Sequence, residues 1–253
     1  MSFDVSADAY QRFMGRWSAP LTGEFLQSAD VRVTGQVLDV GCGPGVLTAV
    51  LVDRYGAPAV AAIDPSESFV AATRERLPGV DVRQGTAEAL PYDDGSFDAA
   101  LAQLVVHFMT DPVAGLRDMG RVTRPGGVVA ACVWDHAGGG SPLSLVWSAA
   151  RDVDPAAPSE ASLPGTEEGQ LPSYARKAGL RDITPSTLTV RQRFETFEEW
   201  WAPYLFGVGP LGAYLGALPE DHLAAVRERC RGLLPEAPFE QPAVAWSVRA
   251  LTP

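Results

Sequence analysis

Short apolar runs of the kind that form buried strands recur through the first half of this 253-residue chain. They are nearly continuous rather than alternating in polarity, which is typical of strands covered on both faces of a sheet. The runs cover residues 36–40, 59–64, 80–85, 97–104 and 127–134. Helical patterns separate them at residues 46–55, 67–77 and 112–124. This alternation predicts an α/β fold with a doubly wound parallel sheet.

The helix predicted over residues 112–124 carries signals at both ends. Asp111 followed by Pro112 is a favourable N-cap and first-turn pair, because the carboxylate accepts free backbone N–H groups and proline has none to leave unpaired. The run "RPGG" at residues 124–127 is expected to stop the helix before the next strand.

The alternation of predicted strands and helices ends after Trp134. Residues 135–142 and 152–172 are rich in Gly, Pro, Ser and acidic residues, so we predict loops there. A short helix at residues 173–178 leads into an alternating strand over residues 182–194, which should be broken near Pro185 because proline cannot donate to a sheet. The last strand is predicted at residues 243–251.

A helical, aromatic-rich stretch separates the last two predicted strands, and the chain shows no internal repeat. We therefore predict one domain with an inserted helical cap rather than two independent domains. Its sections are an N-terminal helical cover (1–30), a core (31–135), variable loops with the sixth strand (136–195), the cap (196–234) and the last strand (235–253).

Composition and charge narrow the class of function. A content of 46% hydrophobic residues is ample for a buried core. The net charge of −11 repels a phosphate backbone, so no nucleic-acid partner is expected. Cys42, Cys132 and Cys230 lack the spacing of a metal site or a disulfide framework, and no metal is expected. The N-terminus lacks a signal peptide and no stretch resembles a membrane span, so we expect a cytoplasmic protein with no membrane partner.

The stretch "VLDVGCGPGVLTAV" at residues 37–50 runs from a strand pattern through Gly41, Gly43 and Gly45 into a helix pattern. A strand that ends in glycines and turns into a helix brings backbone N–H groups and the positive end of the helix dipole close to a ligand. Val46 stands where the third glycine of the dinucleotide fingerprint would fall. Asp64, at the end of the next predicted strand, can accept both hydroxyls of a ribose, or it can be a turn acid or helix cap.

The segment "VLDVGCGPG" resembles the first motif of the class I S-adenosylmethionine-dependent methyltransferases. Further segments follow in that family's order: "AAIDPS", "QGTAEALPYDDGSFDAALAQLVVHF" and "RVTRPGG", with "YQRFMGRW" before them resembling the branch that methylates small molecules. The resemblance covers residues 10–135 strongly and implies a Rossmann-like, mostly parallel seven-stranded sheet with helices on both faces. It implies S-adenosyl-L-methionine as the cofactor and a small-molecule acceptor.

The resemblance also implies roles for individual residues around the cofactor. Gly41, Cys42, Gly43 and Gly45 would form its cradle and Asp64 would bind the ribose. Pro65, Ser66, Thr86 and Ala87 would lie beside the adenine, although the family usually carries Asp where Thr86 stands. Gln103, Asp39 and Arg16 would face the methionine portion, although Arg16 reads equally well as a surface arginine.

Methyl transfer from a sulfonium is an in-line displacement, so the protein mainly aligns donor and acceptor and excludes water. A hydroxyl acceptor needs a base, and His107, after the fourth predicted strand, is the candidate; it also reads as a structural histidine. His136 is a second candidate in the substrate pocket, and His222 reads as a surface residue. We predict that one or two of a set of aromatic residues line that pocket, unless they only fill the core of the cap: Trp147, Trp200, Trp201 and Tyr204.

Two other classes of function stay open. A nicotinamide-dependent oxidoreductase shares the sheet, but the missing third glycine and the absence of a Tyr-x-x-x-Lys pair argue against it. A non-catalytic cofactor-binding or interaction module is the other alternative. The sequence does not identify the acceptor, the methylated atom or the oligomeric state.

Overall fold

The computed structural model describes residues 11–32 and 35–253. Seven strands of this part form one sheet in the order β3-β2-β1-β4-β5-β7-β6. Neighbours from β3 to β5 are parallel, whereas β7 is antiparallel to both β5 and β6. The strands are β1 (Val37–Val40), β2 (Val60–Asp64), β3 (Asp81–Gln84), β4 (Phe97–Gln103), β5 (Thr123–Trp134), β6 (Arg181–Phe194) and β7 (Phe239–Leu251). The predicted fold class, a mostly parallel, doubly wound seven-stranded sheet, is confirmed.

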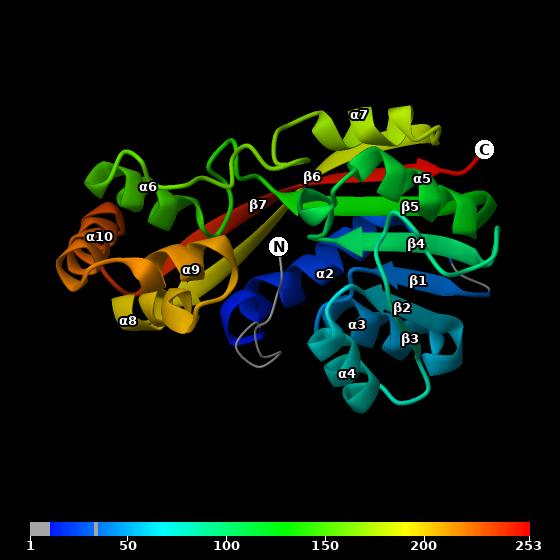
Figure 1. Cartoon of the computed structure of the whole chain (residues 1–253), viewed down its shortest axis with the longest axis horizontal. Helices are drawn as coiled ribbons and strands as arrows, with labels where there is room; N and C mark the ends of the chain where they lie inside the picture. The colour runs from blue at the N-terminus through cyan, green and yellow to red at the C-terminus, as the bar shows by residue number, and fades with distance from the viewer. Residues whose placement is uncertain (1–10, 33–34) are drawn as a thin grey trace.

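Both faces of the sheet are buried, as the apolar runs predicted. In β1 and β2 every residue is buried, and their side chains alternate between two apolar clusters: Val37 and Val60 face one, Leu38 and Ala61 the other. The first face is covered by α2 (Arg16–Ala29), α3 (Val46–Tyr55) and α4 (Glu67–Arg76), and the second by α5 (Pro112–Val122) and α7 (Gln170–Lys177) (Figure 1).

The β6–β7 hairpin is longer than the sheet it joins. β5 pairs with β7 only as far as Trp134 opposite Ala245, whereas β6 continues with β7 to Phe194 opposite Phe239. The rings of Phe194 and Phe239 stack at 5.5 Å, closing the outer end of the hairpin. This arm projects away from the parallel strands and carries the cap (Figure 1).

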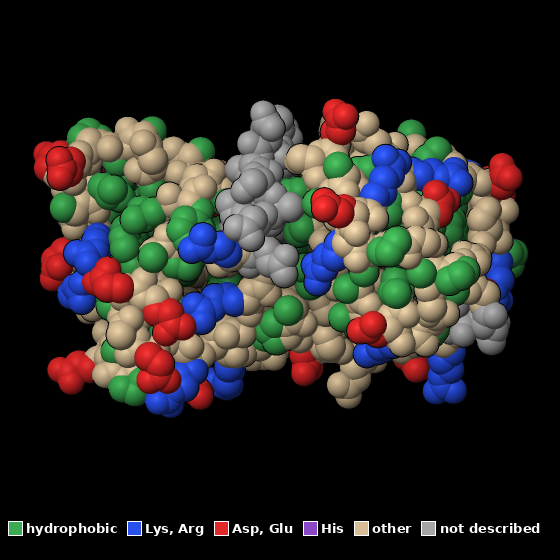
Figure 2. All heavy atoms as spheres, turned by 90° about the horizontal axis from the view of Figure 1, so that it is seen from below, with side chains coloured by type: hydrophobic (Ala, Val, Ile, Leu, Met, Phe, Trp, Pro, Cys, Tyr) green, Lys and Arg blue, Asp and Glu red, His purple; other side chains and the backbone are tan. Residues whose placement is uncertain are grey.

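The cap comprises α8 (Phe197–Trp201), η4 (Ala202–Phe206), α9 (Gly209–Ala217) and α10 (Glu220–Leu233), and α6 (Ser144–Val153) packs against α10. Aromatic rings fill its interior. The ring centres of Trp200 and Tyr204 lie 4.9 Å apart in an edge-on arrangement. Nε1 of Trp200 donates a hydrogen bond to Oε1 of Gln241 in β7. Acidic and basic side chains mingle on its outer surface (Figure 2), where Glu198 pairs with Arg227. The buried cap residues belong to the same apolar cluster as α2 and the first face of the sheet, so the cap is continuous with the core of the domain.

Several element boundaries differ from the predicted ones. The helix predicted over residues 112–124 ends at Val122, because residues from Thr123 onward are already extended and Gly126 takes a positive φ of 73°. The predicted break near Pro185 was wrong: β6 is continuous there, because an edge strand tolerates a residue that cannot donate. Its irregularity falls between Arg181 and Thr184, where Asp182 has a φ of 49°. Helix α6 had not been predicted, and the last strand begins at 239 instead of 243.

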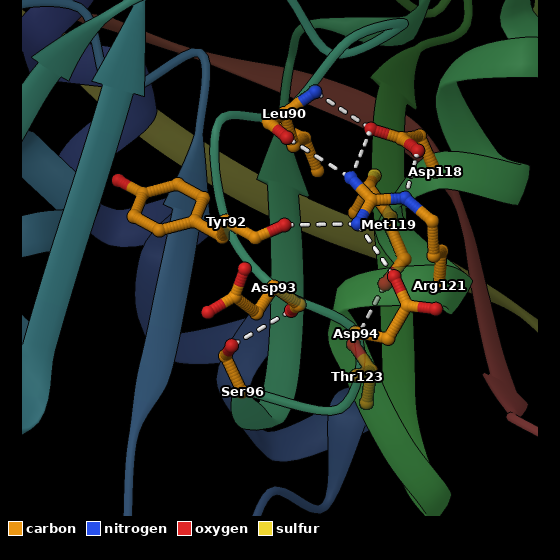
Figure 3. A network of polar contacts seen from close by, with 9 residues as sticks. All are labelled: Leu90, Tyr92, Asp93, Asp94, Ser96, Asp118, Met119, Arg121 and Thr123. Atoms are coloured by element: carbon orange, nitrogen blue, oxygen red, sulfur yellow. Dashed lines mark hydrogen bonds and ion pairs between the residues drawn. The ribbon is translucent and has the colours of Figure 1, made fainter.

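The loop after β3 is tied to α5 by one arginine. Arg121 donates to the carbonyl oxygens of Leu90 and Tyr92 at 2.9 and 2.8 Å. It also pairs with the carboxylates of Asp118 and Asp94 at 2.6 and 2.8 Å (Figure 3). This network fixes the second half of a loop whose first residues face the carboxyl end of the sheet.

The helical cover predicted over residues 1–30 starts outside the described residues, which begin at Gln11 in the short π-helix η1 (Gln11–Gly15). Helix α2 follows and packs against β6, β7 and α3. Within the described ranges, no helix combines the length and apolar character needed to cross a membrane. The three cysteines are buried and unpaired.

Candidate active site

The glycine turn after β1 adopts backbone dihedrals that other residues rarely reach. The φ angle is 72° at Gly41, 53° at Gly43 and 84° at Gly45. A Cβ on Gly41 would lie 2.6 Å from Cγ1 of Val105. A Cβ on Gly43 would meet no atom within 4 Å, because that position faces a cavity. One glycine thus makes room for a neighbouring side chain, and the other leaves the cavity open.

Asp64, at the end of β2, holds this turn in place. Its Oδ2 accepts from the backbone N–H of Gly43 at 2.9 Å, and its Oδ1 accepts from that of Ser66 at 2.8 Å. Burial raises the pKa of the carboxyl, and these two hydrogen bonds act in the opposite direction. Each carboxylate oxygen can accept a second hydrogen bond, so Asp64 can hold the turn and still bind a ligand.

Asp39 is a buried carboxyl in β1 that lines the same cavity. Its Oδ2 accepts from Thr48 Oγ1 of α3 at 2.6 Å. Burial, with a smaller contribution from the charge of Asp64, raises the pKa of Asp39 to about 7. Each oxygen of a carboxylate can accept more than one hydrogen bond, so Asp39 has further capacity to accept, which a cationic ligand group would use.

Two buried polar atoms beside Asp39 have no hydrogen-bond partner among the described residues. They are Oγ of Ser18 in α2 and Oε1 of Gln103 at the end of β4, and both residues line the cavity. Nε2 of Gln103 donates to the Ser18 carbonyl at 3.1 Å, which fixes the orientation of the amide. Buried polar atoms in folded proteins are almost always paired, so these two point to a ligand. Ser18 was missed in the sequence.

Arg16, expected at the methionine end, lies elsewhere. Its guanidinium pairs with Glu199 of α8 at 2.8 Å and lies 4.5 Å from the centre of the Phe194 ring. Residues two positions apart on a helix point about 200° apart, so Arg16 cannot share the direction of Ser18. The arginine joins α2 to the cap.

Together these groups surround a cavity of about 100 Å³ at the carboxyl ends of β1, β2 and β4, which we call the strand-end pocket. It lies where the strand order reverses between β1 and β4, the usual ligand position in open α/β sheets. The rest of its wall is formed by Gly41, Cys42, Gly43, Pro44, Val46, Leu47, Pro65, Phe69, Leu104, Val105 and Phe108.

The other residues expected beside the adenine lie at or outside its rim. Pro65 lines the strand-end pocket and Ser66 caps α4 by accepting from the N–H of Phe69. Thr86 is exposed and Ala87 is buried on the loop after β3, and neither is part of the pocket wall. Gly45 begins α3 below the turn, with its N–H donating to the carbonyl of Cys42.

A second cavity, of about 40 Å³, lies between the sheet and the cap and shares Leu104 and Phe108 with the first. We call it the junction pocket. Leu104 has a φ of 61°, a costly conformation for a leucine, at the boundary of the two pockets. The wall is mostly apolar and comes from segments far apart in the sequence: Phe13, Met14, Leu104, His107, Phe108, Trp134, His136, Leu143, Glu160, Val208, Gly209, Pro210 and Leu211.

Two histidines face each other in the junction pocket, with ring centres 5.8 Å apart. His107 lies in η3 (Val106–Phe108) and is buried, and its Nδ1 has no partner among the described residues. Burial, with a smaller effect of His136, lowers the pKa of His107 well below its usual value. Burial alone lowers the pKa of His136 to about 4. Both imidazoles are therefore neutral near pH 7.

The aromatic residues expected in the substrate pocket are divided. Trp147 of α6 is buried, and its Nε1 donates to Oε2 of Glu160 at 2.6 Å, placing it behind the junction pocket wall. Trp200, Trp201 and Tyr204 lie in the apolar cluster that joins the cap to α2 and the sheet, and none of the three lines the junction pocket. The cap reaches the pocket instead through residues 208–211, for which the sequence offered no signal beyond a Gly-Pro turn.

Comparisons with known proteins find similarity to methyltransferases. Residues 38–131 match a family model described as a methyltransferase domain. An uncharacterized methyltransferase of Mycobacterium bovis is 38% identical over 53% of this chain and 52% of its own length. A trans-aconitate 2-methyltransferase of Methylobacterium nodulans is 30% identical over 53% of this chain and 51% of its own. The chain thus spans about half the length of the curated relatives it matches.

The fold also matches solved structures. A phosphoethanolamine N-methyltransferase of Haemonchus contortus, solved with S-adenosyl-L-methionine, has a TM-score of 0.62 at 18% identity, covering 98% of this chain and 56% of that one. At that identity the likeness concerns the fold. The matched sequence region, residues 38–131, contains the glycine turn, Asp64 and Gln103.

Proposed function

We propose that the chain is a member of the class I S-adenosylmethionine-dependent methyltransferase family and that it methylates a small organic molecule held in the junction pocket. S-Adenosyl-L-methionine is the cofactor of this family. The observation that carries the proposal is that the strand-end pocket and the junction pocket meet at Leu104 and Phe108. Donor and acceptor sites that share a wall satisfy the first requirement of a direct transfer, which is proximity.

The unpaired atoms of the strand-end pocket fit the cofactor. Its methionine end carries an ammonium group, and Asp39, Ser18 Oγ and Gln103 Oε1 offer three acceptors side by side in the wall. Asp64 would accept from the ribose hydroxyls, and the open position at Gly43 leaves space beside the turn. We place Pro65, Ser66, Thr86 and Ala87 toward the adenine. We do not place Arg16 on the cofactor, since it is engaged with Glu199.

When bound, the cofactor supplies a methyl group already activated by a positively charged sulfur. The work left to the protein is to orient the acceptor, exclude water and accept a proton. The apolar wall of the junction pocket excludes water, and the buried rings of Trp134 and Phe13 restrict the orientation of a flat molecule. His107, neutral and with an unpaired Nδ1, would receive the proton, with His136 behind it.

A relative that by name methylates trans-aconitate supports an acceptor of small size. The net charge of −11 opposes a nucleic-acid acceptor. A module that only binds the cofactor is the alternative function, because one fold serves many functions, and detection of methyl transfer to any small acceptor would exclude it.

Calorimetry with S-adenosylhomocysteine tests the cofactor half of the proposal. The wild-type chain should bind this product with micromolar affinity, and Asp64→Ala should bind at least about 100-fold more weakly, because the turn loses its clamp and the ribose its acceptor. Asp53→Ala, which removes an exposed carboxylate from α3, is the matched control and should bind normally. Absence of binding by the wild type would refute the proposal.

A further inference from the structure

The polar atoms of the junction pocket indicate which chemical group it receives. Trp134 is 2% exposed, and its indole N–H, which can only donate, has no partner among the described residues. His107 is 6% exposed and its Nδ1 is also unpaired. As a neutral imidazole His107 has one donating and one accepting nitrogen. Leaving such groups buried and unpaired is unfavourable, so a ligand that pairs both is favoured.

On these grounds, and resting on the proposed function, we propose that the methyl acceptor is a phenol, bound with its hydroxyl between the indole N–H of Trp134 and the imidazole of His107. A hydroxyl oxygen accepts one hydrogen bond and donates another, which matches one donor and one acceptor. Aromatic and aliphatic side chains make up most of the remaining wall, which suits a flat apolar ring.

The charge of the pocket argues against a protonated amine in the same place. Burial lowers the pKa of both histidines, so the environment disfavours a positive charge. Glu160 is the acidic group of the wall, and burial raises the pKa of its carboxyl, which is bonded to Trp147. A neutral acceptor whose hydroxyl is acidic enough to pass its proton to an imidazole is the better match, and an aliphatic alcohol is a much weaker acid.

The reaction balances without any further reagent. The phenol oxygen forms a bond to the methyl carbon while the bond from that carbon to sulfur breaks, and its electron pair stays on the sulfur. The hydroxyl proton passes to His107 as the positive charge leaves the sulfur, so the two adjoining pockets gain no net charge in the step. The products are an aryl methyl ether, S-adenosylhomocysteine and a protonated imidazole, which returns the proton to solvent.

Three para-ethyl compounds distinguish the classes: 4-ethylphenol, 4-ethylaniline and 4-ethyltoluene. Each is incubated with the wild-type chain and S-adenosylmethionine, and products are identified by mass spectrometry. We expect methylation of 4-ethylphenol on oxygen. We also expect it to bind at least about tenfold more tightly than 4-ethyltoluene in the presence of S-adenosylhomocysteine, the gain of roughly one paired buried group.

Trp134→Phe keeps an aromatic ring and removes the N–H, so it should abolish that preference while 4-ethyltoluene binding changes less than about twofold. Trp246→Phe is the matched control, since Nε1 of Trp246 is already bonded to the Thr166 carbonyl outside the pocket and the phenol preference should persist. Equal binding of the phenol and the toluene, methylation of the aniline alone, or an unchanged preference in Trp134→Phe would each overturn the phenol assignment. Intact S-adenosylhomocysteine binding in the same samples would show that the proposed cofactor site survives.

Discussion

The strand-end pocket and the junction pocket are built in different ways, although they touch. The first uses backbone N–H groups, glycines with positive φ and acidic side chains at strand ends, all within the segment from β1 to β4 and its covering helix. The second is made of side chains from η1, the ends of β4 and β5, the loop around residue 160 and the start of α9. A site built from backbone groups depends on the sequence of one continuous segment. In a site built from side chains of distant segments, the residues of one segment can be substituted while the other segments keep theirs.

The largest effect should come from the glycine turn, where two similar substitutions are expected to act differently. Gly41→Ala should destabilise the fold by about 3 kcal/mol, because its methyl overlaps Val105 and the backbone is left-handed. Gly43→Ala should cost about 1 kcal/mol in stability, since its methyl meets open space, but should weaken S-adenosylhomocysteine binding at least about tenfold. Urea unfolding and calorimetry measure the two. Equal loss of stability in both variants would contradict the division of roles.

A second prediction concerns the junction pocket. His107→Phe keeps a flat ring of similar size but removes the proton acceptor, so it should lower the rate of methyl transfer by about 100-fold. Binding of S-adenosylhomocysteine should change less than about twofold, because His107 is absent from the wall of the strand-end pocket. His222→Phe, on the exposed surface of α10, is the control. A parallel loss of cofactor binding would show that the two pockets are not separable.

The buried carboxyl of Asp39 should make the free energy of unfolding depend on pH. Its pKa is about 7 when buried and near 3.8 in the unfolded chain, so the folded state keeps a proton that the unfolded state releases. The stability contributed by this group therefore falls as pH rises from about 4 to 7 and is level above 7. The Asp39→Asn variant has no titrating group at this position. The difference between its free energy of unfolding and that of the wild type should therefore be more favourable to the variant at pH 8 than at pH 5, by about 1–3 kcal/mol. Urea unfolding at both values measures it.

For the Asp39 prediction, Asp53→Asn provides the comparison, since it replaces an exposed carboxylate of α3. A pH-independent effect of Asp39→Asn would show that the folded protein carries Asp39 ionised throughout.

The smallest effects are expected for substitutions of two residues of α2, Ser18 and Arg16. Ser18→Ala should weaken S-adenosylhomocysteine binding about threefold to tenfold, because the variant lacks the unpaired buried Oγ of a residue that lines the strand-end pocket. Arg16→Ala should leave that affinity unchanged and cost less than about 1 kcal/mol of stability, since its ion pair with Glu199 is partly exposed. Calorimetry on both variants decides the matter. Loss of binding in Arg16→Ala would restore the arginine to the cofactor site.

Most of the fold and most residues of the strand-end pocket could be predicted from the sequence. Helix α3 begins at Val46 and ends at Tyr55 as predicted, because glycines flank it on both sides, and Asp111 caps α5. Ser18 escaped notice because a serine in a helix has no motif, and its role depends on which face of α2 turns toward Gln103. Glu160 and residues 208–211 escaped because the other walls of the junction pocket come from separate segments of the chain and loops leave no periodic signal.

The outer end of the β6–β7 arm is where the cap joins the sheet. Chain leaves the sheet at Phe194 and returns at Phe239, two residues that stack on each other. Everything between them is cap, and nothing between them touches the strand-end pocket. Phe194 and Phe239 are therefore the two positions at which a cap of different length would join the sheet with the β6–β7 register kept.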